Sequence, residues 1–413
     1  MSGKDILILG GGMIVHDQIL PSLYQLQRLG EIGKISICAR HTTPLKFLQE
    51  SPFIKEAFPE QTFIPFPPLN TPENEYYPDL YKEAIKNLPP RQCVFVALPD
   101  HLHYPAIMEA LAHEQHVICV KPLVQTYKQL VEIKKISKEK RLFVGVEYHK
   151  RFDIRSLLAR KNYQNGLFGK FVIGEAKMIE PYYYRHSNFQ NWFTCDISDP
   201  FTYVGCHYVD LVAFITGLKP VSVSVVGIRK PFPNGNIGYL WSHGRVIYEN
   251  GGILSVINGL GYPDMGGGSN QQGLELYFEN ENCTTTLKHD DQFRGVSYSI
   301  REELIEPKKK FFTINTDYFR LVPWNGPGLK PVGYGYTSIE ELVHCVKKID
   351  SSDDEQKQLE EMERIDNLGI IATPKNSFYN ELINEAGRLS ISEKGRVYSI
   401  NYNSSYPDIY PEN

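Results

Sequence analysis

The chain has 413 residues, of which 42% are hydrophobic and 22% charged, and its net charge at pH 7 is −4. A single core rarely grows to this length, so we expect two domains of ordinary globular composition. The slight excess of acidic residues and the lack of a basic block argue against a nucleic-acid or anionic-membrane partner.

The seven cysteines are dispersed along the chain, and none forms a CxxC pair. This pattern argues for free thiols in a reducing compartment and against a disulfide framework or a zinc site. The first apolar segment is too short for a signal peptide, and no apolar run reaches the length of about 20 residues that a membrane-spanning helix needs. We therefore expect a cytoplasmic protein with no membrane partner and no bound metal.

The first 150 residues alternate apolar strands with helical segments. Strands that are apolar throughout and alternate with helices predict a parallel sheet covered on both faces. Residues 1–150 are therefore predicted to form a Rossmann dinucleotide-binding domain, a doubly wound α/β fold. The expected strands are 5–9, 34–39, 93–98, 116–120 and 142–147, and the expected helices are 17–29, 78–88, 104–114 and 125–140.

Residues 151–413 follow a different pattern, in which apolar and polar residues alternate along each strand. This pattern predicts an open-faced, mainly antiparallel sheet with flanking helices, an α+β domain that binds substrate and carries an oligomer contact. We expect strands at 170–184 and 220–230, hairpins at 245–259 and 274–287, and helices at 206–217, 338–349 and, last, 376–391. The charge-rich stretch 351–364 is expected to be a solvated helix or loop, and residues after Gly395 an extended tail.

Gly10, Gly11 and Gly12 close the first strand and precede a helix. Such a turn lets a pyrophosphate approach a helix N-terminus, with Met13 and Ile14 offering backbone N–H groups. The third glycine of the usual pattern is replaced by Val15, so the glycines alone favour a dinucleotide site and a plain strand–helix turn equally. The second strand ends at Arg40 without an acidic residue, which favours NADP over NAD.

Several later motifs carry a family resemblance in the right order. They are LPDHLH (98–103), VKP (120–122), GVEYHKRFD (145–153), PFTYVGCHYVDLVAFITG (200–217) and ATPKNSFYNELINEAGRLSI (372–391). Together they resemble the glucose–fructose oxidoreductase/inositol dehydrogenase (Gfo/Idh/MocA) family of NAD(P)-dependent enzymes, which typically reads T-P-N-x-x-H after its fourth strand and E-K-P after its fifth. The chain departs from the family at Val15, Val120 and Tyr203.

The resemblance implies which residues bind and react. Its cofactor-binding positions are Gly10, Gly12, Met13, Ile14, Arg40, Leu98, Pro99, His101, His103, Lys121 and Pro122. Its catalytic positions are Lys121, His207 and Tyr203: Lys121 orients the hydroxyl, and His207, expected near a helix N-terminus that keeps it neutral, moves the proton. Asp210 either orients His207 or stabilises the first turn of its helix.

Further positions are expected in the substrate pocket: His149, Arg151, Tyr184 and Trp192. Arg151 could equally serve as a structural brace, and the tyrosine-rich stretch 180–193 could equally pack in a core.

Three functions are consistent with these residues. The first is an NAD(P)-dependent sugar dehydrogenase or reductase that transfers a hydride between nicotinamide and a secondary alcohol or ketone of a sugar, polyol or glycoside. The second is an NAD-dependent redox glycosidase that works through a transient keto-sugar, and the third is a non-enzymatic NAD(P)/sugar sensor on the same fold. The antiparallel sheet is expected to join copies of the chain into a dimer or tetramer.

Overall fold

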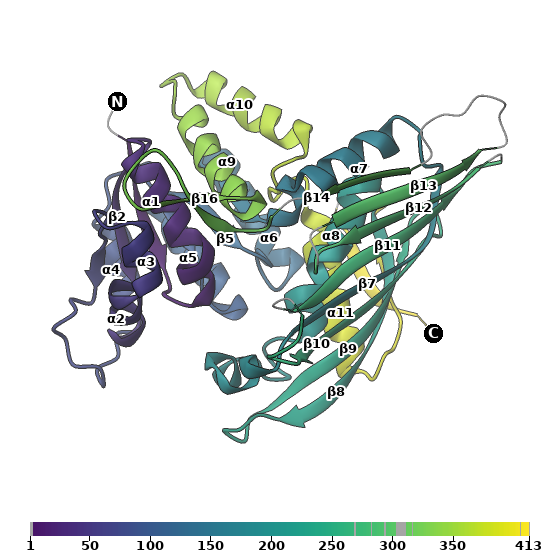
Figure 1. Ribbon diagram of the computed structural model, residues 1–413, viewed down its shortest axis with the longest axis horizontal. Coiled ribbons are helices and arrows are strands. Elements are labelled where there is room, and N and C mark those ends of the chain that lie inside the picture. The colour runs from purple at the N-terminus through teal and green to yellow at the C-terminus, as the bar shows by residue number, and fades with distance from the viewer. Residues whose placement is uncertain are drawn as a thin grey trace. The chain divides into compact units, whose positions relative to one another are not determined.

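The computed structural model describes residues 3–267, 270–281, 283–292, 295–302, 311–315, 317–404 and 406–412. The chain folds into two compact units (Figure 1). The first unit comprises Met1–Val124, Lys128–Phe152 and Asp317–Asn376, and the second comprises Gln125–Tyr127, Asp153–Thr316 and Ser377–Asn413.

The first unit contains the predicted parallel sheet, with strand order β3-β2-β1-β4-β5-β6. Its six strands are β1 (Lys4–Leu9), β2 (Ile32–Cys38), β3 (Ile64–Phe66), β4 (Cys93–Val96), β5 (His116–Val120) and β6 (Val144–Glu147). This order, which reverses between β1 and β4, is that of the doubly wound dinucleotide-binding fold, so the predicted fold class of this part is confirmed. The strand β3 lies in a stretch that the sequence pattern leaves unassigned.

Helices connect these strands. They are the π-helix η1 (Val15–Ile19), α1 (Leu20–Arg28), α2 (Thr43–Glu50), α3 (Pro52–Ala57), α4 (Leu80–Lys86), the 3-10 turn η2 (Asp100–Leu102), α5 (His103–Ala112), α6 (Tyr127–Lys140) and the 3-10 turn η3 (His149–Phe152). The predicted helices in this part are present, and α2 and α3 are additional.

The second unit contains a mixed sheet, mostly antiparallel, with order β14-β13-β12-β11-β7-β10-β9-β8-β17-β18. Its strands are β7 (Lys170–Pro181), β8 (Pro220–Pro231), β9 (Ile237–Tyr248), β10 (Ile253–Tyr262), β11 (Gln271–Glu279), β12 (Cys283–Asp290), β13 (Gly295–Glu302), β14 (Phe311–Asn315), β17 (Tyr398–Asn401) and β18 (Asp408–Pro411). Both predicted hairpins form, β9–β10 and β11–β12. Gly251, with φ +84°, makes the turn of the first, as its Asn-Gly pair predicts.

Helices cover one face of this sheet (Figure 1). They are α7 (Ile154–Gln164), α8 (Cys206–Thr216) and α11 (Phe378–Ser392); the short turns η4 (Tyr182–His186), η5 (Asn188–Asn191) and η6 (Phe201–Gly205) lie between β7 and α8. One core unites α8 and α11 with the inward side chains of the strands. The expected extended tail is ordered as β17 and β18, and β17 pairs with β8.

The compact units divide the chain differently from the expected boundary near residue 150. The segment 317–376 returns to the first unit and contributes β15 (Arg320–Pro323), β16 (Leu329–Val332), α9 (Tyr334–Ile349) and α10 (Glu355–Leu368). The apolar side of α9, which includes Leu342 and Val346, shares one core with β1, β2 and α1. Burial of that stripe is the reason the segment packs here, and the charge-rich stretch 351–364 falls within α10 and the turn before it.

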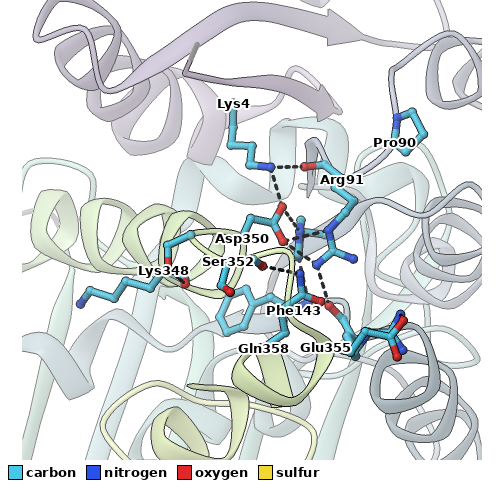
Figure 2. Close-up of polar contacts among 12 residues, drawn as sticks. Lys4, Pro90, Arg91, Phe143, Lys348, Asp350, Ser352, Glu355 and Gln358 are labelled. Carbon is cyan, nitrogen blue, oxygen red and sulfur yellow. Dashed lines mark hydrogen bonds and ion pairs between the residues drawn. The ribbon is translucent and has the colours of Figure 1, made fainter. Parts of the chain in front are cut away.

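Asp350, at the end of α9, fastens this returning segment to the amino edge of the parallel sheet (Figure 2). Its carboxylate lies 2.5 Å from Nζ of Lys4, 2.5 Å from Nη2 of Arg91 and 2.9 Å from Nε2 of His116. Burial alone would raise the pKa of Asp350, but these three partners outweigh burial and lower it well below its ordinary value.

The ring of His116 is held in one tautomer. Its Nδ1 accepts a hydrogen bond from the Phe143 backbone N–H at 2.9 Å, so Nε2 carries the proton that it donates to Asp350. Burial lowers the pKa of His116, which agrees with a neutral ring in this place.

Replacing Asp350 with asparagine should destabilise the protein by about 1–3 kcal/mol near neutral pH, less than breaking a fully buried pair because Lys4 and Arg91 are partly exposed. A carboxyl whose pKa is depressed by folding stabilises the protein above its unfolded pKa of about 3.9 and loses that effect as the pH falls. The difference between D350N and wild type in urea unfolding should therefore shrink as the solution is acidified. Asp353→Asn, an exposed neighbour, is the control; equal stability of D350N and D353N at neutral pH would contradict the role of Asp350.

Candidate cofactor and active site

The glycine turn after β1 has the geometry of a phosphate-binding loop. Gly10 has φ +108°, and a Cβ added to it would lie 2.2 Å from the carbonyl oxygen of Ala97, so only glycine fits there. A Cβ added to Gly12 would meet nothing within 4 Å. The backbone at Gly12 therefore borders open space, where a ligand can approach the main chain.

A helix begins directly after this turn, at Met13. The carbonyl oxygen of Gly12 accepts hydrogen bonds from the N–H groups of Val15 and His16, both at 3.1 Å. The N–H groups of Met13 and Ile14 belong to the first turn, whose donors have no partner within a helix. They are placed as a pyrophosphate site requires.

Val15 and His16 have structural surroundings. Val15 is fully buried, and it opens the π-helical turn η1. Ring nitrogens of His16 lie 2.6 Å from Oδ1 of Asp17 and 2.8 Å from Oγ of Ser51.

Arg40 lies exposed just after the carboxyl end of β2. The rings of His41 and His101 are half-buried, and the Nδ1 atoms of both are buried without a hydrogen-bond partner among the described residues. Burial lowers the pKa of both histidines, and the positive charge of Arg40 lowers both further. This edge of the sheet thus combines one cation with two polar nitrogens that a bound ligand can satisfy.

Sequence reasoning missed the loop that packs over this position. The ring of Tyr76 lies 5.1 Å from that of His41, and the N–H of Tyr77 donates to the carbonyl of Arg40 at 2.8 Å. Both tyrosines belong to an irregular stretch with neither helical nor strand periodicity, so only tertiary structure could reveal them.

His103 joins the two loops that follow β4 and β5. Its side chain is fully buried, with Nε2 2.7 Å from the carbonyl oxygen of Leu98 and Nδ1 2.8 Å from that of Pro122. Carbonyl oxygens only accept hydrogen bonds, so the N–H of the ring donates to one of these loops, and the tautomer decides which one. The expected cofactor contact of His103 is thus replaced by a brace that fixes the loop carrying Lys121.

Lys121 follows directly after β5, at the carboxyl edge where ligands of doubly wound sheets bind. It is half-buried, and the peptide bond between it and Pro122 is cis. Leu98 and Pro99 occupy the matching place after β4. The structure therefore gathers the glycine turn, Arg40, the 98–101 segment and Lys121 at one edge of the sheet, as the sequence predicts.

His149 and Arg151 are less available for a substrate than the sequence suggests. Nδ1 of His149 lies 3.1 Å from Glu147, and its ring lies 5.0 Å from that of Tyr318. Arg151 is only 2% exposed; its guanidinium lies 5.8 Å from the ring centre of Tyr148 and contacts Asn376. These contacts favour the structural interpretation of Arg151.

In the second unit, His207 lies in the middle of a helical run. The sequence analysis expects it near a helix N-terminus, but helical turns begin at Phe201 and continue through α8. Asp199 caps that run, because its carboxylate accepts from the N–H and hydroxyl of Thr202 at 3.0 and 2.8 Å. The argument that a helix terminus disfavours the charged form of His207 is therefore wrong, since that effect fades beyond the first turn.

Asp210 has a role that neither sequence-based interpretation anticipates. Its Oδ1 accepts hydrogen bonds from Asn380 at 2.7 Å and Tyr379 at 3.2 Å, which ties α8 to α11. It lies too far along the helical run to stabilise the first turn.

Aromatic rings surround Tyr203, one turn before His207. Phe189 and Phe193 are buried and lie 5.2 and 5.5 Å from its ring, while the half-buried Trp192 lies 5.8 Å away. The ring of Tyr184 stacks on Phe189 at 5.0 Å. Tyr184, Trp192 and Tyr203 thus form one partly exposed aromatic surface beside the helix of His207.

Comparison with known families decides the nature of the first unit. Residues 4–148 match the family model GFO_IDH_MocA, described as an oxidoreductase family with an NAD-binding Rossmann fold. Residues 4–148 are therefore similar to the NAD-binding part of the Gfo/Idh/MocA family.

Curated relatives match about a third of this chain. An uncharacterized oxidoreductase of Schizosaccharomyces pombe is 30% identical over 137 residues, which are 32% of this chain and 36% of that protein. The 2,7-anhydro-N-acetylneuraminate hydratase of Escherichia coli is 26% identical over 136 residues, 33% of this chain and 36% of that enzyme. The match thus spans about a third of the length of these relatives.

Solved structures share the Gfo/Idh/MocA fold over nearly the whole chain. An inositol dehydrogenase homolog from Azotobacter vinelandii, complexed with NADH and myo-inositol, has a TM-score of 0.65 at 15% identity and covers 96% of this chain and 98% of its own. A 3-ketoreductase from Actinomadura kijaniata, in complex with NADP and TDP-benzene, has a TM-score of 0.62 at 14% identity, with 94% and 98% covered. This likeness confirms the predicted combination of a Rossmann domain and a mainly antiparallel sheet domain.

The first unit fits the dinucleotide that its family binds. The open backbone at Gly12 and the unsatisfied nitrogens of His41 and His101 are features that a bound nicotinamide dinucleotide would use. Within the ranges that the structure describes, no helix is long and apolar enough to cross a membrane.

Replacing His103 with alanine should remove the ring that links the two loops and leave the carbonyl to which it donates without that hydrogen bond. We expect a loss of about 1–3 kcal/mol of folding stability, measured by urea unfolding. His113→Ala, at the exposed end of the same helix, is the control. If H103A were as stable as H113A, His103 would not be the brace described above.

Proposed function

We propose that the protein is an NAD(P)-dependent oxidoreductase that transfers a hydride between nicotinamide and a secondary alcohol or ketone of a sugar, polyol or glycoside. The observation that carries this proposal is the position of Lys121 at the carboxyl end of β5, within a domain of the NAD-binding Gfo/Idh/MocA family. Gly10, Gly12, Met13 and Ile14 would hold the pyrophosphate, and Leu98, Pro99, His101 and Pro122 would border the rest of the cofactor.

The bound cofactor supplies the hydride acceptor or donor. The chain must orient the reacting carbon and move one proton, because oxidation of an alcohol releases a hydride and a proton together. Lys121 would orient the hydroxyl and stabilise the alkoxide with its positive charge. His207 would accept the proton in oxidation and return it in reduction, and Tyr203 would hydrogen-bond the same oxygen.

The aromatic surface of Tyr184, Trp192 and Tyr203 supports a carbohydrate as the substrate. Its rings rest on the buried Phe189 and Phe193, so they are fixed in place without the ligand. Aromatic faces pack against the apolar side of sugar rings. His149 remains a candidate substrate-binding residue, whereas the contacts of Arg151 make it a weaker one.

A redox-neutral reaction is the second candidate function. The Escherichia coli relative is named a hydratase, and hydration changes no net oxidation state. A keto-sugar formed transiently on bound NAD would acidify the neighbouring C–H and permit elimination, after which the hydride returns; a glycosidase could work in this way. Cleavage or hydration of a glycoside without accumulation of reduced cofactor would favour it over net oxidation.

We propose that copies of the chain associate through the outer face of the second unit's sheet. Tyr277, Ile173, Ile253 and Ile247 pair across β11, β7, β10 and β9 and form an apolar row, in which Tyr277 is 43% and Ile173 49% exposed. Apolar patches of this kind mark contact sites between proteins. Either a dimer or a tetramer would bury this apolar row.

The cytoplasmic location stays a prediction, which the seven free cysteines support.

Replacing Lys121 with methionine or His207 with asparagine should each reduce kcat/KM by about 10²–10⁴-fold, measured as the change in nicotinamide absorbance over a panel of sugars and keto-sugars. The kcat/KM of the double variant should be only slightly below that of the less active single variant, because both groups act in the same step. Lys128→Met, an exposed lysine nearby, is the control. Binding of NADP and sugar without turnover by the wild type would instead indicate a sensor.

Replacing Arg40 with alanine should weaken NADPH binding by about 10–100-fold and leave NADH binding unchanged, because a 2′-phosphate gains charge-assisted hydrogen bonds from a guanidinium. Lys34→Ala, at the opposite end of β2, should change neither affinity. Equal loss of both affinities in R40A would refute a 2′-phosphate site.

Native mass spectrometry of the purified chain should show the cofactor mass and a dimer or tetramer. A purely monomeric spectrum would refute the sheet contact.

A further inference from the structure

A closed group of charged side chains lies in the interior of the second unit. Asp153, Arg155, His289 and Asp291 each have a side chain that is 0% exposed. Asp153 caps α7, where its carboxylate accepts from the N–H of Arg155 at 2.8 Å, while His289 lies on β12 and Asp291 follows that strand. The network therefore fastens the start of α7 to the end of β12.

Arg155 holds both carboxylates at once. Its Nε lies 2.9 and 2.8 Å from the two oxygens of Asp153, and its Nη2 donates to Oδ1 of Asp291 at 2.7 Å. A third contact runs from Nη1 to the backbone carbonyl of Asp290 at 3.0 Å. The guanidinium of Arg155 thus bridges the carboxylates of Asp153 and Asp291.

The same two carboxylates face the ring of His289. Its Nε2 lies 3.4 Å from Oδ2 of Asp153, and its Nδ1 lies 3.4 Å from Oδ2 of Asp291. The hydroxyl of Ser156 is 3.5 Å from Nε2. At these distances each carboxylate forms an ion pair with the ring when the ring is protonated.

The charges of the network sum to zero only in one protonation state. Two ionised aspartates contribute −2 and Arg155 contributes +1, so a neutral His289 leaves −1 in the interior, whereas a protonated His289 leaves 0. A net charge in a fully buried place is costly, because it has lost its hydration. The geometry and the charges therefore both favour the imidazolium.

The three residues Asp153, His289 and Asp291 also have the side chains of a metal site, with ligand atoms within 4.8 Å of one another. A metal would need the carboxylate oxygens that Arg155 already binds. The guanidinium and the imidazolium supply the positive charge that a metal would bring.

The network reaches the helix of His207 through Tyr208. The buried hydroxyl of Tyr208, the residue next to His207 on α8, donates to Oδ2 of Asp291 at 2.9 Å. The same carboxylate oxygen also faces the ring of His289. Any change in the charge of the network is therefore transmitted to a fixed point on α8.

We propose that Asp153, Arg155, His289, Asp291 and Tyr208 form a proton-dependent clamp, which holds α8 in place while His289 is protonated and loosens when that proton is lost. Among the described residues, the charged groups that face His289 are Asp153 and Arg155 from the start of α7 and Asp291 after β12. Tyr208 of α8 joins them through Asp291.

The direction of the pKa of His289 agrees with this arrangement. Burial alone would lower it, but Asp291 and Asp153 outweigh burial and raise it above the ordinary value. A histidine whose pKa is raised by folding stabilises the protein fully below its unfolded pKa, about 6.5, and loses that effect as the pH rises through the folded pKa. The clamp thus loosens toward alkaline pH.

Hydrogen–deuterium exchange of the full-length protein at about pH 6 and about pH 9, corrected for intrinsic exchange rates, tests the clamp directly. Protection of α8 should fall by about tenfold for each unit by which folding raises the pKa of His289. Protection of α1 in the first unit serves as the internal reference. Neither substrate nor cofactor is needed, so the result is separate from the proposed redox function.

Charge-changing variants sharpen the test. His289→Gln leaves a net charge of −1 at every pH, so protection of α8 should be low and independent of pH, and the Tm at pH 6 should fall by roughly 6–20 °C. Asp291→Asn makes the network neutral only when His289 is neutral, so its pH dependence should be reversed. The double variant H289Q/D291N is neutral throughout and should show protection that is high and independent of pH.

Three outcomes would overturn the proposal. The first is a wild-type α8 whose protection does not change with pH relative to α1. The second is a D291N variant that loosens toward alkaline pH as the wild type does. The third is a rise in Tm on adding Zn²⁺ or Mg²⁺ that H289Q abolishes, which would show that the group binds a metal.

Discussion

Parallel strands cannot be joined by a short turn, and this constraint organises the first unit. Each strand must be followed by a crossover that returns to the amino edge, so every carboxyl end meets at the opposite edge. The glycine turn, Arg40, the segment after β4 and Lys121 come together there although they lie far apart in the chain. The amino edge receives the complementary set, in which Lys4, Arg91 and His116 converge on Asp350. The carboxyl edge thus carries the proposed site residues, and the amino edge carries the polar contacts of Asp350 that stabilise the fold.

Structural hydrogen bonds also fix the backbone near Lys121. The proposed catalytic role of Lys121 needs a fixed backbone, and the buried ring of His103 lies within hydrogen-bond distance of both loops that follow the neighbouring strands. In the second unit, Asp199 caps the start of the helical run that carries His207. Asp210 ties that run to α11, and Tyr208 ties it to the buried charged group. The proposed reacting groups are therefore each surrounded by residues whose hydrogen bonds are structural.

The parallel sheet, both hairpins and the order of the motifs could be predicted from the sequence, because they depend on periodicity and local turn chemistry. The start of the helix that carries His207 could not, since Phe201 and its neighbours form a π-helical turn without a sequence signature. The partners of Asp210 lie about 170 residues away on α11, and one partner of Asp153, His289, lies more than 130 residues away on β12. Long-range pairing of this kind is set by packing of whole elements, and a single sequence carries no local sign of it. Arg151 shows the converse: its position in a motif suggests a ligand contact, but its burial against Tyr148 gives it a packing role.

The return of residues 317–376 to the first unit makes the dinucleotide-binding part of the chain discontinuous. The larger part of the second unit, Asp153–Thr316, is inserted between Phe152 and Asp317, and Ser377–Asn413 follows the returning segment. A fragment that stops at Phe152 would contain the whole parallel sheet, yet it would lack the helix that covers α1 and the carboxylate between Lys4 and Arg91. The family's match to residues 4–148 therefore ends before the residues of α9 that complete the hydrophobic core of the first unit.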